Sequence, residues 1–87
     1  MASNLDEYRR KINQMDMELL QLLNQRAECA IEIGKIKRAK NMEIFVPGRE
    51  KEILENLSQH NAGPLSNEMI CHIFQEIISI MKEVQSI

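Results

Sequence analysis

The chain has 87 residues and a formal net charge of -2, so it forms at most one domain with a thin hydrophobic core. This charge argues against general nucleic-acid binding, because a nucleic-acid-reading domain of this size usually carries a marked basic excess. The first residues, MASNLDEYRRK, contain no apolar segment typical of a signal peptide, and no run approaches 18 apolar residues. We therefore expect a cytoplasmic protein that does not cross a membrane.

The two cysteines give no sign of a disulfide or a metal site. Cys29 and Cys71 are far apart, and neither lies in a CxxC motif or near a His at zinc spacing. Both are interpreted as small buried hydrophobic residues. The chain also contains no phosphate loop, dinucleotide fingerprint or nucleophilic Ser arrangement, so no metal and no cofactor is expected.

The first part of the chain predicts one long amphipathic helix. Apolar residues recur every three or four positions from about residue 5 to 39, and no proline interrupts them before Pro47. Gly34 is the one weak point, because glycine costs about 1 kcal/mol relative to alanine inside a helix. At 1.5 Å per residue the helix would be about 50 Å long, whereas a compact chain of this length is about 30 Å across.

Two shorter helices are expected after an irregular connection, NMEIFV. Pro47 suits the first turn of a helix, Gly63-Pro64 ends that helix, and Ser66 suits the N-cap of the next one. The sequence therefore predicts an all-α fold in one domain, residues 1–87. The expected helices span about 5–39, 47–61 and 66–86.

The length of the first helix predicts a dimer. Two short helices cannot cover an apolar stripe that runs the full length of a rod of about 50 Å, and a monomer would expose an unusually large apolar patch. We expect the long helices of two chains to pack against each other. The alternative is a monomer whose first helix breaks near Gly34.

Two cations lie in the apolar stripe of the first helix. Arg26 occupies a position that the pattern reserves for an apolar residue, and Lys37 points within about 20° of the same direction, roughly 16 Å further along. A buried cation is costly unless it is paired, and no carboxylate lies on that face. The two cations could therefore hold an anion, with Gln85 closing the site from the third helix. Alternatively, Arg26 reaches solvent and Lys37 only favours the negative end of the helix dipole.

Arg9 is too distant to share a ligand with Arg26 in the same chain. It lies 17 residues earlier, which is about 25 Å along a helix. In a dimer with antiparallel long helices, Arg9 of one chain would approach Arg26 and Lys37 of the other. Alternatively, Arg9 is an ordinary basic surface residue.

The candidate site residues belong to a longer ordered set: Arg9, Ile12, Asp16, Leu19, Leu20, Leu22, Leu23, Arg26, Ile33, Gly34, Ile36, Lys37, Arg49, Glu50, Phe74, Glu76, Ile77, Ile78 and Gln85. The order and spacing of this set resemble the all-helical class of chorismate mutases over about residues 5 to 86. The resemblance implies an intertwined homodimer of three-helix chains, an isomerase that converts chorismate to prephenate in phenylalanine and tyrosine biosynthesis. It implies no cofactor.

The resemblance also implies a role for each polar position. Arg26, with Arg9 from the second subunit, would hold the two carboxylates of chorismate. Lys37 and Gln85 would donate hydrogen bonds to the ether oxygen of the breaking bond.

Glu50 would bind the ring hydroxyl, and Arg49 would support the carboxylate end.

Two positions depart from the family pattern. Val46 stands where many members have Asp, although the contact expected there comes largely from the backbone. Met81 stands where a Ser usually faces the ring carboxylate, and the loss of one neutral hydrogen bond, worth about 1 kcal/mol, predicts a raised KM and not inactivity.

Two other functions remain open from the sequence. One is an isochorismate-pyruvate lyase of the same fold. The other is a non-catalytic helical dimerisation or regulatory module, which Met81 would favour. The domain could stand alone or belong to a fusion with a prephenate dehydratase, a prephenate dehydrogenase or an earlier shikimate-pathway synthase.

Overall fold

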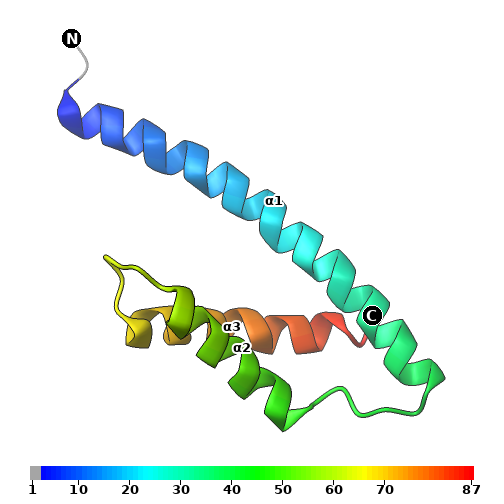
Figure 1. The fold of residues 1–87 in the computed structure, drawn as a ribbon. Coiled ribbons are helices and arrows are strands. Elements are labelled where there is room, and N and C mark those ends of the chain that lie inside the picture. The colour runs from blue at the N-terminus through cyan, green and yellow to red at the C-terminus, as the bar shows by residue number, and fades with distance from the viewer. Residues whose placement is uncertain (1–2) are drawn as a thin grey trace.

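A computed structural model describes residues 3–87, and this part of the chain consists of three α-helices without strands. The helices are α1 (Asn4–Ala39), α2 (Pro47–His60) and α3 (Asn67–Val84). Figure 1 shows α1 as a long rod, with α2 and α3 gathered beside its C-terminal half. The predicted all-α fold with one long and two shorter helices is confirmed.

Local signals in the sequence set where the helices begin. The Ser3 side chain accepts a hydrogen bond from the backbone N–H of Asp6 (3.1 Å), and Ser66 accepts one from Met69 (3.1 Å). These N-caps satisfy backbone donors that have no partner inside the helix. Pro47 is the first residue of α2, where its missing N–H costs nothing. The roles predicted for Pro47 and Ser66 are confirmed.

The core is small and lies where the C-terminal half of α1 meets α3. In the part of the chain that the structure describes, α3 packs against both α1 and α2, which do not pack against each other. The buried residues are Ala30 and Gly34 of α1 and Ile78 and Met81 of α3. The two sides of α3 thus hold α1 and α2 apart and leave room for a pocket between them.

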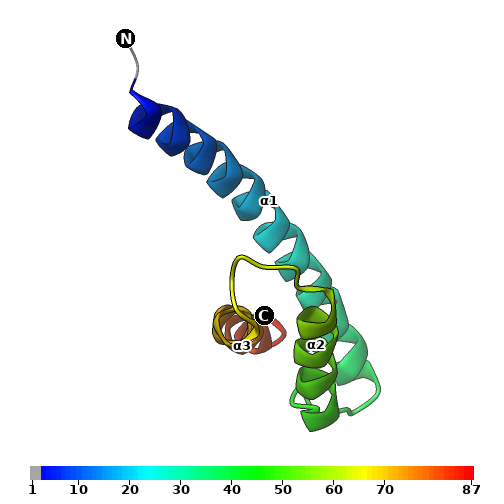
Figure 2. The ribbon, with the colours of Figure 1, turned by 60° about the vertical axis from the view of Figure 1, so that its left-hand side comes forward.

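The N-terminal half of α1 projects beyond the other helices (Figure 2). The described chain measures 60 × 26 × 16 Å, and α1 runs through Gly34 without a break, so the alternative of a helix broken near Gly34 is wrong. A row of apolar side chains along this half, the α1 stripe, is exposed. The α1 stripe comprises Tyr8, Ile12, Met15, Leu19 and Leu22.

The two cysteines differ in their surroundings. Cys71 is half-buried, and its Sγ lies 3.7 Å from Ser58 Oγ. Cys29 is exposed, so the prediction that both are buried is wrong for Cys29. The reason is that α3 covers the neighbouring Ala30 but leaves the face at Cys29 open.

No helix among residues 3–87 has the length and apolar content needed to span a bilayer, and the cytoplasmic location stays a prediction.

Gly34 allows the end of α3 to approach α1 closely. A Cβ atom added at Gly34 would collide with the backbone carbonyl group of Gln85, whose carbonyl carbon would lie only 2.8 Å away. A backbone group cannot swing aside as a flexible side chain can. The residue that the sequence marks as a weak point of the helix therefore makes the α1–α3 contact possible.

We expect Gly34→Ala to lower the free energy of unfolding by about 1 to 3 kcal/mol, because overpacking at the α3 contact outweighs the gain in helix propensity. Gly48→Ala is the matched control, since a Cβ at Gly48 meets nothing within 4 Å. Denaturant unfolding at one fixed chain concentration measures both variants. A Gly34→Ala protein at least as stable as Gly48→Ala would contradict the assigned contact.

Candidate active site

A pocket of about 490 Å³ lies between the helices. Residues of α1, the connection 40–46, α2 and the C-terminal half of α3 all line it. Its size is typical of sites for small molecules. Much of the lining is apolar, including Ala30, Ile33, Ile53, Ile78 and Met81.

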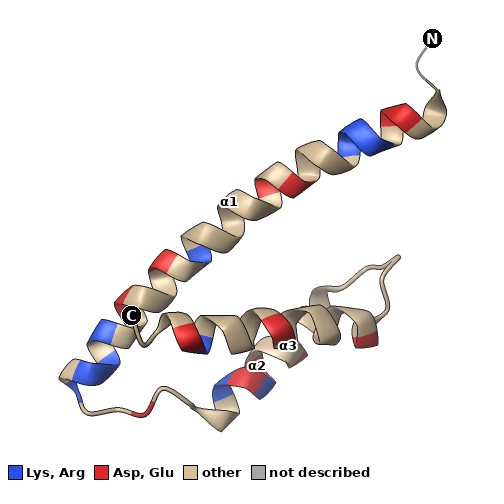
Figure 3. Cartoon of the chain, turned by 180° about the vertical axis from the view of Figure 1, so that it is seen from behind, with Lys and Arg blue, Asp and Glu red and all other residues tan. Residues whose placement is uncertain are grey.

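The charged groups of the pocket are mostly positive. Four cationic side chains and one carboxylate line it: Arg26, Lys37, Arg49, Lys82 and Glu50. Figure 3 shows basic segments at the end of α1 and at the start of α2, on either side of the connection. Because charges interact more strongly in a poorly solvated, apolar cavity than in water, this pocket is suited to a small molecule with more than one negative charge.

Lys37 is held in the pocket by two neutral oxygens. Its half-buried Nζ donates to the backbone carbonyl of Ile44 (2.8 Å) and to Gln85 Oε1 (2.9 Å). No carboxylate pairs with Lys37 among the described residues. Since an ammonium group has three N–H donors, one donor and the full positive charge remain available to a bound molecule.

Gln85 is oriented by the same contact. An ammonium group only donates, so the amide atom that faces Lys37 is the oxygen, and the NH₂ group of Gln85 remains a donor. Gln85 lines the pocket as the C-cap of α3, one residue beyond Val84, and not as a residue within the helix. The site therefore presents two adjacent donors, the Lys37 ammonium and the Gln85 amide.

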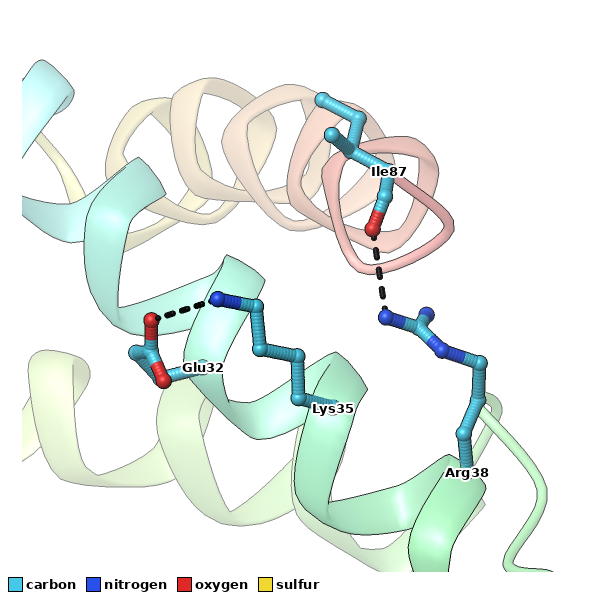
Figure 4. Close-up of polar contacts among 4 residues, drawn as sticks. All are labelled: Glu32, Lys35, Arg38 and Ile87. Atoms are coloured by element: carbon cyan, nitrogen blue, oxygen red, sulfur yellow. Dashed lines mark hydrogen bonds and ion pairs between the residues drawn. The ribbon is translucent and has the colours of Figure 1, made fainter.

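Arg38 fastens the last turn of α3 to α1. Its guanidinium donates to the backbone carbonyls of Gln85 (2.7 Å) and Ile87 (3.2 Å), the second of which Figure 4 shows. Carbonyls at a helix C-terminus have no partner within the helix, and a cation is favourable there. Nearby, Lys35 pairs only with Glu32 on the same helix (3.1 Å), and both are exposed. Arg38 thus positions the backbone that carries the Gln85 amide.

The two arginines of the pocket differ in exposure. Arg26 is half-buried, whereas Arg49 forms an ion pair with Glu52 (2.6 Å) in which both side chains are largely exposed. Both arginines also line an adjoining hollow that reaches Phe74. Arg26 and Lys37 both line the pocket, in agreement with their predicted place on the inward face of the first helix.

Glu50 meets a lysine that sequence reasoning missed. Lys82 Nζ lies 2.8 Å from Glu50 Oε1 and 5.0 Å from the centre of the Phe45 ring. Lys82 lies four residues after Ile78 and three before Gln85. It is therefore on the pocket side of α3, next to the apolar row that ends at Met81. This second row of the helix was the signal that could have identified it.

The structure brings together all but one of the predicted site residues. Seven of them line the pocket: Arg26, Lys37, Val46, Arg49, Glu50, Met81 and Gln85. Arg9 is exposed on the projecting half of α1 and does not line the pocket of its own chain. Met81, where the family pattern favours Ser, is 6% exposed and presents an apolar surface to the pocket.

Comparison with known proteins decides the family. The model of the family described as chorismate mutase type II matches residues 8–86. The chain belongs to this chorismate mutase family. The resemblance inferred from the residues is confirmed, and the activity of the family is the isomerisation of chorismate to prephenate.

Curated relatives of the chain are larger proteins. It is 44% identical over 79 residues to a bifunctional chorismate mutase/prephenate dehydratase of Aquifex aeolicus, covering 86% of this chain and 22% of that protein. A protein of the same description from Escherichia coli is 38% identical over 71 residues, covering 80% of this chain and 18% of that protein. The chain spans about a fifth of the length of these relatives.

Solved chorismate mutases share the fold over nearly their whole length. The form II structure from Thermus thermophilus has a TM-score of 0.95 at 27% identity and covers 97% of this chain and 96% of that one. The Helicobacter pylori chorismate mutase in complex with prephenate has a TM-score of 0.89 at 35% identity and covers 98% and 92%. The three helices therefore match those of these two solved proteins over nearly the whole of each chain.

We expect Arg38→Met to loosen the end of α3. Loss of the two hydrogen bonds, worth about 1 kcal/mol net, should speed backbone amide exchange at residues 85–87 by about fivefold. Hydrogen exchange followed by mass spectrometry or NMR measures this change. Lys35→Met is the control, because the Lys35 ammonium pairs with Glu32 on its own helix and not with the end of α3. Unchanged exchange at 85–87 in Arg38→Met would refute the role of Arg38.

Proposed function

We propose that this pocket binds chorismate and catalyses its rearrangement to prephenate through the paired donors Lys37 and Gln85. The observation that carries the proposal is the Lys37 ammonium, which is fixed by two neutral oxygens in a pocket rich in cations. Family membership supports chorismate as the substrate, and the geometry of the pocket supports the proposed mechanism.

The chemistry of this rearrangement matches what the pocket offers. One C–O bond breaks and one C–C bond forms within the same molecule, so all atoms are conserved and no nucleophile is required. The enzyme has to fold the substrate so that the reacting carbons meet, and to stabilise the negative charge that grows on the ether oxygen. Donors fixed in advance do this at little cost, because they need not reorganise during the reaction.

Lys37 and Gln85 are suited to the ether oxygen. Lys37 and Gln85 present adjacent donors, the third N–H of the ammonium and the amide NH₂. Because Gln85 accepts from Lys37 through its oxygen, its NH₂ group stays available to the ligand. The contact strengthens as negative charge develops, which favours the transition state over the bound substrate.

The remaining charged groups of the pocket are suited to the rest of the substrate. Arg26 of α1 and Arg49 of α2 both line the pocket, where Arg26 can pair with one carboxylate and Arg49 can support the carboxylate end. Glu50 can accept a hydrogen bond from the ring hydroxyl. Met81 gives apolar contacts only, so we propose that it costs affinity and not turnover, whereas the backbone contact expected at Val46 is kept.

The α1 stripe supports an intertwined homodimer. Its apolar side chains, such as Tyr8 (62% exposed) and Leu22 (60% exposed), lie on the half of α1 that neither α2 nor α3 covers. Packing of two such helices side by side would bury both stripes and so remove a large apolar surface from water. A chain of the same sequence carries the matching surface, so the second copy is the natural occupant.

The dimer would also complete each site. Arg9 lies in the same projecting half of α1, remote from the pocket of its own chain. With antiparallel long helices, Arg9 of one subunit would reach the pocket of the other and add a cation for the second carboxylate of chorismate. Dimerisation is then required for full activity as well as for stability.

The proposed function is tested directly by following the fall in chorismate absorbance with the purified protein. Incubation with isochorismate tests the alternative, because a lyase would be identified by the product it forms. We expect Lys37→Ala to lower kcat at least about 100-fold, because a fixed donor to a developing oxyanion is worth about 3 to 4 kcal/mol. Lys35→Ala should retain parental activity. Chorismate turnover by a folded Lys37→Ala protein at the parental rate would refute the site.

Mixing two inactive variants tests the shared site. Arg9→Ala and Lys37→Ala dimers, unfolded and refolded together in equal amounts, should regain about a quarter of parental activity, because half of the dimers are mixed and one of their two sites has both residues. Each variant refolded alone is the control. No recovery in the mixture, or a mass in solution equal to one chain, would contradict an intersubunit site.

A further inference from the structure

Lys82 joins three separate parts of the pocket. It lies on α3, its ammonium pairs with Glu50 of α2 at 2.8 Å, and it lies over the ring of Phe45, in the connection, at 5.0 Å. The Lys82 and Glu50 side chains are 37% and 34% exposed, so the pair is half-buried at the wall of the pocket. No other ion pair among the described residues joins two different helices.

The geometry of this pair leaves Glu50 free to bind a ligand. Lys82 approaches only one of the two carboxylate oxygens, Oε1, and this oxygen is buried. The contact thus fixes the carboxylate and leaves its second oxygen as an acceptor. A carboxylate can accept several hydrogen bonds at once, so Glu50 can still accept one from a hydroxyl group in the pocket.

The Glu50 side chain needs such a partner because it is flexible and is the only carboxylate in a pocket with four cations, as far as the described residues go. Without Lys82, Glu50 could turn toward a cation that binds substrate, such as Arg26 or Lys37, and neutralise it. A fixed side chain also loses less conformational entropy when the ligand binds. Lys82 is itself restrained by the Phe45 ring, since cation–π contacts favour a defined position of the ammonium group.

We propose that Lys82 is a positioning residue, which holds Glu50 against α3 so that its carboxylate accepts a hydroxyl of the substrate and stays away from the cations that bind the substrate's carboxylates. The inference rests on the proposed function, because it concerns how the same pocket recognises chorismate. Lys82 acts through Glu50 and not by contacting the substrate. It therefore determines affinity for a ligand that has a hydroxyl donor as well as negative charge.

A double-mutant cycle between Lys82 and Glu50 tests this role. We expect Lys82→Met to raise KM for chorismate about tenfold and to change kcat by less than about threefold, because the hydroxyl contact is made equally in the bound substrate and the transition state. Glu50→Gln should raise KM by a similar factor. The KM of the double variant should lie within about twofold of the higher of the two single-variant KM values, because both changes remove the same contact.

Two further variants separate charge from packing. Lys82→Arg keeps the positive charge and should stay within about threefold of the parental KM. Lys82→Gln provides a second neutral variant if Lys82→Met does not fold. Lys51→Met is the control, since Lys51 pairs with Glu55 on the same helix (3.9 Å) and does not line the pocket.

The outcomes are distinguishable. Effects on KM that multiply in the double variant would overturn the inference and show that Lys82 contacts the substrate itself. An unchanged KM in Lys82→Met would also overturn it and leave Lys82 with a structural role only. Failure of the parental chain to consume chorismate would overturn the proposed function instead.

Discussion

The ammonium group of Lys37 is the point at which the separate parts of the chain meet. It belongs to α1, it donates to Ile44 in the connection to α2, and it donates to Gln85 at the end of α3. Both acceptors are neutral, so they fix the position of the cation without cancelling its charge. The remaining charge can therefore act on a ligand in an apolar pocket, where it is worth much more than in water.

The end of α3 has to be held firmly for this arrangement to work. Helix ends fray readily, and Gln85 is one residue beyond the last helical residue of α3. Gly34 lets the backbone of Gln85 lie directly against α1, and Arg38 caps its carbonyl. These two contacts compensate for the weakness of placing the proposed catalytic amide at a helix terminus.

The single chain leaves much of its apolar surface uncovered. Its buried residues are confined to one crossing of α1 and α3, and the α1 stripe lies outside that crossing. A second chain would cover the stripe and bring Arg9 to the pocket, so the same contact would serve stability and catalysis. Apparent stability should then depend on protein concentration, as it does for obligate dimers.

Local sequence signals predicted the helices and part of the site, whereas contacts between residues far apart in the chain could not be predicted from such signals. The periodicity of α1 and the cap at Ser66 act over a few residues, so one sequence is enough to predict them. Gly34 was interpreted as a weak point because the sequence does not show that the end of α3 lies against it. Lys82 resembled an ordinary basic residue near a helix C-terminus until its partner Glu50 on another helix was visible.

The pH dependence of Gln85→Glu tests most directly whether the group beside Lys37 works as a hydrogen-bond donor. The amide of the parental protein does not titrate, so its kcat/KM should not fall because of this group as pH rises through neutrality. A glutamic acid can donate only when protonated, and its ionised form would pair with Lys37. We therefore predict that kcat/KM of the variant is about 100-fold or more below the parental value near pH 7.5 and rises as pH falls toward about 5. Equal activity of the two proteins near pH 7.5, or a variant whose activity stays low and constant as pH falls, would contradict the account.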